Sequence, residues 1–297
     1  MTLRLGTRGS ALALAQAELV AELLDEEVEL VPITTSGDRG DRSPAAGGDK
    51  ARFVKEIEEA LLDGSVDLAV HSAKDVPSEL PEGLSIVGVP ERADARDALC
   101  GAASLDDLGP GAVVGTGSLR RASQLLALRP DLEVRELRGN VDTRLGKLGE
   151  GGLQALVLAL AGLERLGRSS EGAPLPELVP APGQGCLALE AREDDGAVAA
   201  AAVAITDRSA LTCLTSERAL VQALDASCHT PLGAHATLDG DALSLEAFVG
   251  LPDGSVWLRD SLDGEAGSPA ALGREVAERM LVAGAADLLR QAEAAAR

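Results

Sequence analysis

A lysine and an aspartate stand side by side where an apolar segment of this sequence ends. In the segment VDLAVHSAKDVP, residues 66–77, Lys74 and Asp75 directly follow a run of small and branched apolar residues. Side chains just beyond the carboxyl end of a parallel strand line the crevice of such sheets. A carboxylate held there beside a cation stays ionised, and it can transfer protons or stabilise a positive charge. A solvated turn without a chemical role would show the same pattern.

Arginines and hydroxyl residues occur at several further strand ends, although the chain as a whole is acidic. The segment GTGSLRR, residues 115–121, follows an apolar run and opens a helical pattern, where backbone N–H groups could bind an anion. The residues at these strand ends are Arg8, Ser10, Thr116, Ser118, Arg120, Arg121, Arg138, Arg144 and Arg165. Guanidinium groups bind carboxylates and phosphates through paired hydrogen bonds, so the set predicts a small substrate with several such groups. Ordinary surface arginines on strand–helix turns are the alternative.

Cys228 lies in a polar loop, ASCHTPLG, directly after a predicted helix. A thiolate is the best side-chain nucleophile at neutral pH, so this position could form a covalent bond to a ligand. The neighbouring His229 is a poor candidate for its base, because adjacent residues seldom face each other. Cys186 and Cys213 stand in apolar surroundings, which is typical of structural cysteines. No spacing of Cys, His or carboxylates indicates a metal site or a disulfide framework, so we expect free thiols and no metal.

The formal net charge of the 297 residues is −21. Such a chain repels phosphates, which excludes non-specific binding to nucleic acid or to anionic membranes. Acidic composition with few lysines predicts a halophilic protein, since the Debye length falls to about 3 Å in molar salt. A GC-rich gene is the alternative explanation. No apolar run approaches the roughly 18 residues that span a bilayer, and residues 1–10 lack a signal-peptide core, so we expect a cytoplasmic protein.

Strand and helix patterns alternate through the first 160 residues, which predicts an α/β fold with mostly parallel sheets covered by helices. The expected strands are 3–5, 28–33, 66–70, 112–114, 132–137 and 153–160. Helices are expected after the N-cap Ser10, at 118–128 and at 141–148. The last 90 or so residues predict a separate α+β module, with a helix at 209–224, a hairpin of strands 242–249 and 256–258, and one long final helix.

Eight segments, taken together and in order, resemble the hydroxymethylbilane synthase (porphobilinogen deaminase) family. They are TRGSALALAQA, FVKEIEEALLDG, DLAVHSAKDVP, VGTGSLRR, LRGNVDTR, LALAGLERLG, PAPGQG and ASCHTPLG. The resemblance implies two domains similar to periplasmic binding proteins and a smaller C-terminal α+β domain. The implied domains are 1–93 with 187–204, then 94–186, and finally 209–297, which carries the cysteine loop.

The resemblance also implies the chemistry. In the family a dipyrromethane cofactor is attached to the loop cysteine, here Cys228, by a thioether. Four porphobilinogen molecules are added to it head to tail with loss of ammonia, and hydroxymethylbilane is released for tetrapyrrole biosynthesis. By match, Asp75 is the catalytic carboxylate that stabilises the cation formed as ammonia leaves. The family acts as a monomer.

The same resemblance divides the basic residues into two sets. The implied ligands of the cofactor carboxylates are Lys74, Thr116, Ser118, Arg120, Arg121 and Arg144. The implied ligands of the incoming substrate are Arg8, Ser10, Arg138 and Arg165.

Two other functions remain open at this point. The first two domains alone would suit an anion-binding solute receptor of the periplasmic-binding-protein type, but that class carries a secretion signal or lipobox and would leave the last module without a role. A cysteine hydrolase based on Cys228 and His229 would need an orienting Asn or Asp and an oxyanion hole, which the sequence does not display.

Overall fold

The computed structural model of the chain describes residues 2–38, 48–226 and 230–295. The chain forms two compact units, the first made of Met1–Ala93 with Gly185–Thr212 and the second of Asp94–Gln184 with Cys213–Arg297. The first unit is thus built from two separate stretches of sequence. The predicted division into three domains stays a prediction, since the last segment groups with 94–184 by compactness.

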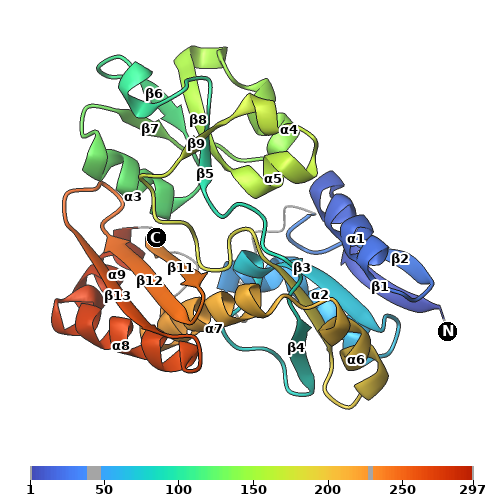
Figure 1. The fold of residues 1–297 in the computed structure, drawn as a ribbon. Helices are drawn as coiled ribbons and strands as arrows, with labels where there is room; N and C mark the ends of the chain where they lie inside the picture. The colour runs from blue at the N-terminus through green and yellow to red at the C-terminus, as the bar shows by residue number, and fades with distance from the viewer. Residues whose placement is uncertain (1, 39–47, 227–229, 296–297) are drawn as a thin grey trace. The chain divides into compact units, whose positions relative to one another are not determined.

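A five-stranded sheet in the order β2-β1-β3-β10-β4 forms the centre of the first unit (Figure 1). Its strands are β1 (Leu3–Arg8), β2 (Val28–Ile33), β3 (Leu68–Ser72), β4 (Leu84–Gly88) and β10 (Leu187–Arg192). β1 pairs in parallel with β2 and β3, whereas β10 runs antiparallel to both β3 and β4. Four strands therefore share one direction, and the strand that follows the return from the second unit is reversed.

The sheet at the start of the second unit has the equivalent order, β7-β6-β8-β5-β9. Its strands are β5 (Asp97–Cys100), β6 (Val113–Gly115), β7 (Glu133–Arg135), β8 (Leu153–Ala159) and β9 (Ala173–Leu175). β6 is parallel to β7 and β8, and β5 is antiparallel to β8 and β9. Here too, the reversed strand is the first one after the chain enters the unit. The fold is α/β as predicted, with each sheet mixed by one reversed strand.

Successive strand residues point to opposite faces of a sheet, so the apolar strands of the first sheet present apolar side chains on both faces. Helices cover both of these faces. α1 (Ala11–Leu23) and α6 (Gly196–Ala204) pack against the face that carries Leu68 and Val70. α2 (Gly48–Leu62) packs against the face that carries Ala69. The second sheet is covered in the same way.

In the second sheet, α3 (Leu119–Leu128) covers the face of Val114 and Val157. α4 (Val141–Gly146) and α5 (Leu160–Arg165) cover the face of Val113 and Leu156. Short 3-10 turns lie at Ala73–Asp75, Leu105–Asp107, Glu150–Gly152 and Ser169–Glu171.

The last part of the chain is an antiparallel sheet of three strands with three helices packed on it (Figure 1). Its elements are α7 (Arg208–Ala223), β11 (Leu232–Asp239), β12 (Ala242–Gly250), β13 (Trp257–Glu265), α8 (Pro269–Val282) and α9 (Ala285–Ala295). The predicted hairpin joins β12 to β13. The prediction of one long final helix is wrong, because the chain turns at Gly284, whose φ of 104° is rarely adopted by residues with a side chain.

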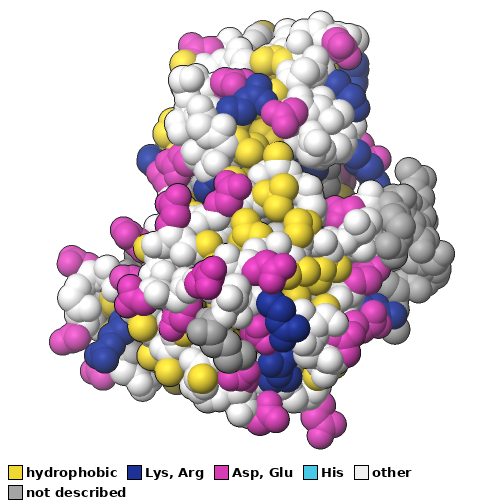
Figure 2. Space-filling model, turned by 90° about the vertical axis from the view of Figure 1, so that its right-hand side faces the viewer, with side chains coloured by type: hydrophobic (Ala, Val, Ile, Leu, Met, Phe, Trp, Pro, Cys, Tyr) yellow, Lys and Arg dark blue, Asp and Glu magenta, His cyan; other side chains and the backbone are white. Residues whose placement is uncertain are grey.

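Asp and Glu side chains lie across the whole face shown in Figure 2, between smaller groups of Lys and Arg. This distribution agrees with the net charge of −21. Among the described residues, no single helix is long and apolar enough to cross a bilayer. α6 and α7 meet that criterion by length and composition only as a pair, and the pair is bent by 110°.

Candidate functional site

The carboxyl ends of β1, β2 and β3 lie along one edge of the first sheet, because these strands are parallel. Arg8 is the last residue of β1, and Ser10 caps α1 by accepting a hydrogen bond of 3.3 Å from the Ala13 N–H. The Arg8 guanidinium pairs with Asp38 at 2.5 Å and lies over the ring of Phe53, 4.4 Å from its centre. Arg8 is therefore held by neighbours from the segment after β2 and from α2.

Asp38 is itself fixed by the backbone that surrounds it. The Thr35 hydroxyl donates to Asp38 Oδ2 at 2.8 Å, and the Thr35 N–H donates to the same oxygen at 3.3 Å. Burial alone would raise the pKa of Asp38, but the hydrogen bonds from Arg8 and Thr35 outweigh it and lower that pKa. The Arg8–Asp38 pair is thus a fixed ion pair near neutral pH.

Lys74 and Asp75 form a single 3-10 turn with Ala73 directly after β3. The Ala73 N–H donates to the Cys186 carbonyl at 3.0 Å, which ties this turn to the start of β10. Both charged side chains are half-buried and lie at the same sheet edge as the end of β1. The side chain of Asp75 is therefore accessible to a ligand, whereas the backbone beneath it is fixed.

Three ionisable side chains from α2, β3 and β10 form a cluster beside the strand that leads to Asp75. His71 on β3 pairs with Glu190 on β10, with 2.8 Å between Nε2 and Oε2, and both side chains are almost fully buried. Glu58 on α2 is 7% exposed. Burial first and the nearby Glu190 second raise the pKa of Glu58 to about 7, although His71 partly offsets them.

In the second unit, Thr116 and Ser118 occupy the turn between β6 and α3. The Ser118 hydroxyl accepts a hydrogen bond of 3.4 Å from the Arg121 N–H and so caps α3. The Thr116 hydroxyl accepts a hydrogen bond of 3.1 Å from the Ser118 N–H. Both predicted hydroxyl ligands thus already have backbone partners that shape the turn.

Arg120 and Arg121, in the first turn of α3, are buried, with exposures of 4% and 5%. Both pair with Asp97 at the start of β5, Arg120 at 2.7 Å and Arg121 at 2.8 Å. Asp97 is 0% exposed, and the two guanidiniums outweigh its burial and hold its pKa far below the ordinary range. The two arginines therefore have a structural partner that the sequence analysis did not foresee, and their role toward a cofactor stays a prediction.

The three remaining predicted arginines differ in their surroundings. Arg138 is exposed and pairs with Glu136 at 2.5 Å. Arg165 is the half-buried last residue of α5. Arg144, on the short helix α4, is half-buried, and burial together with the charge of Arg121 lowers its pKa. Arg144 and Arg121 are therefore electrostatic neighbours.

Arg120 and Arg121 thus form one cluster around Asp97, and the charge of Arg121 also lowers the pKa of Arg144. Among the described residues, the Nε atoms of Arg120 and Arg144 are buried without a hydrogen-bond partner. Positive charge and donors that are buried without partners are unfavourable unless an anion compensates them. The cluster therefore fits a ligand that carries several carboxylates.

Cys228, the predicted point of covalent attachment, lies outside the described residues, as do Ser227 and His229. The three described cysteines are buried (Cys100, Cys186 and Cys213). Burial raises the pKa of the Cys100 thiol to about 11, which leaves it protonated at neutral pH. None of these three is thus suited to nucleophilic attack. The described residues contain no group of three or more His, Cys, Asp or Glu side chains that could hold a metal ion.

Sequence reasoning missed two residues of this arrangement. Asp97 begins an apolar strand, which is an unusual place for an acid, but nothing in the spacing connects it with arginines 23 and 24 residues further on. Gln184 donates to the Asp97 carboxylate at 2.9 Å and to the Ala95 carbonyl at 2.7 Å. Its only signal was its place in the PAPGQG segment.

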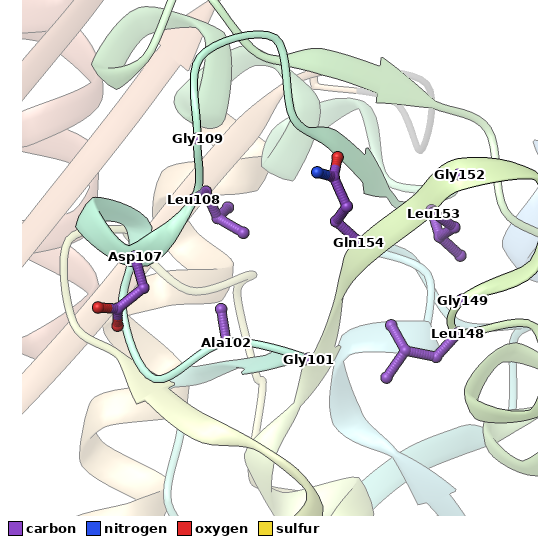
Figure 3. A pocket seen from close by; sticks show the side chains of 10 residues that line it. All are labelled: Gly101, Ala102, Asp107, Leu108, Gly109, Leu148, Gly149, Gly152, Leu153 and Gln154. Atoms are coloured by element: carbon purple, nitrogen blue, oxygen red, sulfur yellow. The ribbon is translucent and has the colours of Figure 1, made fainter.

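A hollow of about 580 Å³ in the second unit does not belong to this arrangement. It lies beside Leu153, at the start of β8, whereas the candidate residues follow the carboxyl ends of β6, β7 and β8. Figure 3 shows mainly apolar side chains around it, with the Asp107 carboxylate turned away from Gln154. The Gln154 side chain already accepts a hydrogen bond from the Val113 N–H at 2.7 Å. The hollow is thus at the opposite end of the sheet from the candidate site.

Solved structures similar to this chain include periplasmic receptors. A periplasmic substrate-binding protein of an ABC transporter from Coxiella burnetii has a TM-score of 0.44 at 15% identity, with 73% of this chain and 96% of that chain covered. The methionine-binding protein MetQ has a TM-score of 0.40 at 18% identity, with 68% and 88% covered. Similarity at this level carries no functional argument.

Sequence relatives are far more similar. Residues 3–200 match the family model described as "Porphobilinogen deaminase, dipyromethane cofactor binding domain", and residues 211–282 match "Porphobilinogen deaminase, C-terminal domain". The porphobilinogen deaminase of Thermus thermophilus is 47% identical over 297 residues, covering 96% of this chain and 97% of that protein. That of Deinococcus radiodurans is 46% identical over 302 residues, covering 97% and 98%. This chain therefore belongs to the porphobilinogen deaminase family.

Proposed function

We propose that this chain catalyses the hydroxymethylbilane synthase (porphobilinogen deaminase) reaction. It joins four porphobilinogen molecules head to tail, with loss of ammonia, on a covalently bound dipyrromethane primer, and it supplies hydroxymethylbilane for tetrapyrrole biosynthesis. The observation that carries this proposal is the match of both family models, in order, along one chain. The arginine cluster around Asp97 supports it, because each pyrrole unit of such a chain carries two carboxylates.

We propose that Cys228 holds the dipyrromethane through a thioether. When bound, this group supplies the pyrrole carbon to which the first substrate unit is joined. The residues proposed to hold its carboxylates are Lys74, Thr116, Ser118, Arg120, Arg121 and Arg144. Those proposed to bind the incoming porphobilinogen are Arg8, Ser10, Arg138 and Arg165. The buried, unpartnered Nε atoms of Arg120 and Arg144 support the first set.

Asp75 is proposed as the catalytic carboxylate. Its side chain is half-buried on a turn whose backbone is fixed to β10, so that little reorganisation is needed during the reaction. Its carboxylate oxygens accept a hydrogen bond from a substrate pyrrole N–H and stabilise the positive charge that develops as the C–N bond to ammonia breaks. The same oxygens can hold the proton that is exchanged with the departing amine.

We propose a cytoplasmic monomer that takes porphobilinogen as its small-molecule substrate and binds neither nucleic acid nor membranes. Its net charge of −21 supports this and the further proposal that the protein is adapted to high salt.

Intact mass spectrometry of the purified protein tests the function. We expect a mass greater than that of the chain by two linked pyrrole units, and we expect a Cys228→Ser variant to show the mass of the bare chain. If the parent protein is bare, incubation with porphobilinogen in high salt should add the two units. Failure to gain any mass after that incubation would reject the proposed function.

A further inference from the structure

Asp97 accepts hydrogen bonds from three side chains that reach it from different parts of the second unit. Arg120 donates through Nη1 at 2.7 Å and Nη2 at 3.1 Å, Arg121 donates through Nε at 2.9 Å, and Gln184 donates through Nε2 at 2.9 Å. The carboxylate is fully buried at the start of β5. Asp97 therefore fixes the first turn of α3 to the start of β5, the first strand of the second unit.

Each arginine also has a second anchor. Arg120 Nη1 donates to the Val179 carbonyl at 2.7 Å, and Arg121 Nη1 donates to the Val157 carbonyl at 2.9 Å. Gln124, one turn further along α3, exchanges two hydrogen bonds with the backbone of Val179, at 2.7 and 3.0 Å. Between their anchors, the two guanidiniums have little freedom to rotate toward a ligand, so their position is set before any ligand arrives.

The cluster has an excess of positive charge. Arg120 and Arg121 contribute two positive charges and Asp97 contributes one negative charge, while the charge of Arg144 acts on Arg121 as well. The third side chain of the described residues that donates to Asp97 is the neutral amide of Gln184. Burial first and the positive charge of Arg121 second lower the pKa of Arg144.

We infer that Asp97 is a positioning residue for the cofactor: it holds Arg120 and Arg121 in place while leaving uncompensated positive charge for the cofactor carboxylates. This inference rests on the proposed function. Asp97 and the cofactor are then partners of the same guanidiniums, so removal of one changes how strongly the other stabilises the protein. A residue with a merely structural role would stabilise the loaded and unloaded protein equally.

The measurement is the increase in melting temperature that loading produces. The loaded form is the protein with its Cys228, checked by intact mass, and the unloaded form is the same protein with Cys228→Ser. In Asp97→Asn we expect the unloaded protein to melt at a lower temperature, and we expect loading to raise that temperature by about 3 °C or more less than it does in the parent. Arg120 and Arg121 are then no longer held in place for the cofactor carboxylates.

Arg144→Gln should have the opposite effect on the unloaded protein. It relieves repulsion from Arg121, so the unloaded protein should melt at the parent's temperature or higher, whereas loading should stabilise it less than the parent. Asp131→Asn is the matched control, since it removes one exposed acid of the second unit that pairs with Arg129 away from the cluster. It should leave the increment unchanged.

Asp97→Glu tests position rather than charge, and it decides the question if Asp97→Asn does not fold. It keeps the carboxylate but moves it by one methylene, so the loaded fraction should fall well below the parent's while the unloaded protein stays folded. Full loading of Asp97→Glu, or equal increments in Asp97→Asn, Arg144→Gln and the parent, would overturn the inference. A parent protein that never gains the cofactor mass would instead reject the proposed function.

Discussion

Two buried carboxylates of this chain have opposite electrostatic surroundings. Asp97 faces two guanidiniums, which keep it ionised in spite of its burial. Glu58 is also buried, but its carboxylate neighbour Glu190 adds to the effect of burial and raises its pKa to about 7. At the residue scale, therefore, burial raises the pKa of both acids, and the charge of the partners decides whether that effect is overcome.

The raised pKa of Glu58 predicts a pH dependence of stability. In the unfolded chain Glu58 ionises near its ordinary value of 4.5, whereas in the folded protein it keeps its proton up to about pH 7. The folded state thus binds more protons between these values, so this residue's contribution to stability falls as the pH rises from about 4.5 to 7. The loss amounts to about 2–3 kcal/mol.

Urea unfolding of Glu58→Gln at several pH values measures this contribution. Relative to the parent, the variant should gain stability as the pH rises through that window. Glu22→Gln, which removes an exposed acid on α1, is the control and should follow the parent. Parallel curves for Glu58→Gln and the parent would show that Glu58 ionises normally.

Asp75→Asn tests the catalytic carboxylate. The amide keeps the size of the side chain but removes its charge, so kcat should fall at least about 100-fold while the loaded mass and the melting temperature stay at the parent's values. Steady-state formation of hydroxymethylbilane is the measurement. Glu79→Gln, an exposed acid four residues later, should keep full activity. Turnover by Asp75→Asn within a few-fold of the parent would remove Asp75 from the mechanism.

At the scale of elements, the turn between β12 and β13 packs closely against α3. Gly254 has a φ of 70°, and a Cβ at this position would lie 2.5 Å from the Ala127 nitrogen. The helix that carries Arg120 and Arg121 at its start therefore contacts this hairpin near its end. Two different effects, an unfavourable φ and a steric clash, act on any side chain at Gly254.

Gly240 separates the two effects. It has a φ of 59° in the turn between β11 and β12, but a Cβ added there would meet no described atom within 4 Å. Gly240→Ala should thus cost about 1 kcal/mol from its backbone conformation alone, whereas Gly254→Ala should cost at least about 2 kcal/mol. Thermal unfolding of both variants is the measurement. Equal losses would mean that α3 shifts freely away from the hairpin.

Local signals explain which elements the sequence predicts well. Ser10 and Ser118 are N-caps with hydroxyls directly before helical patterns, and the strands 28–33 and 153–160 are short apolar runs; the structure has these elements within a residue or so. β11 escaped prediction because its segment, LGAHATLD, follows Pro231 and carries few large apolar residues. The break at Gly284 was missed because Ala and Leu continue on both sides of it.

The candidate site was only partly predictable for a physical reason. Side chains that follow a parallel strand lie at the carboxyl edge of its sheet, and this rule needs only one chain segment at a time. It therefore predicted that Arg120 and Asp75 lie at sheet edges. The partner of Arg120, in contrast, depends on β5 being reversed and lying two strands from β6. No spacing in the sequence encodes that arrangement, so Asp97 became visible only in the fold.

At the scale of the whole molecule, the acidic surface predicts a dependence on salt. Repulsion between the acidic groups is screened over about 10 Å at 0.1 M salt and about 3 Å at 1 M. The melting temperature should therefore rise by about 5 °C or more between 0.1 and 2 M KCl. Sucrose at matched osmolality controls for effects that do not depend on charge. Equal melting temperatures at both salt concentrations would contradict adaptation to high salt.

The place of β10 has a consequence for the synthesis of the protein. β10 lies between β3 and β4 in the first sheet, yet about 100 residues separate β4 from β10 along the chain. At about 5–20 residues per second, a ribosome needs roughly 5–20 s to make that interval. During this time β3 and β4 have been synthesised, but β10, which pairs with both of them, has not. Strand edges left unpaired in this way can pair with the wrong partner. The first unit is thus begun before the second unit, but it receives its full sheet only after the strands β5 to β9 of the second unit have been made.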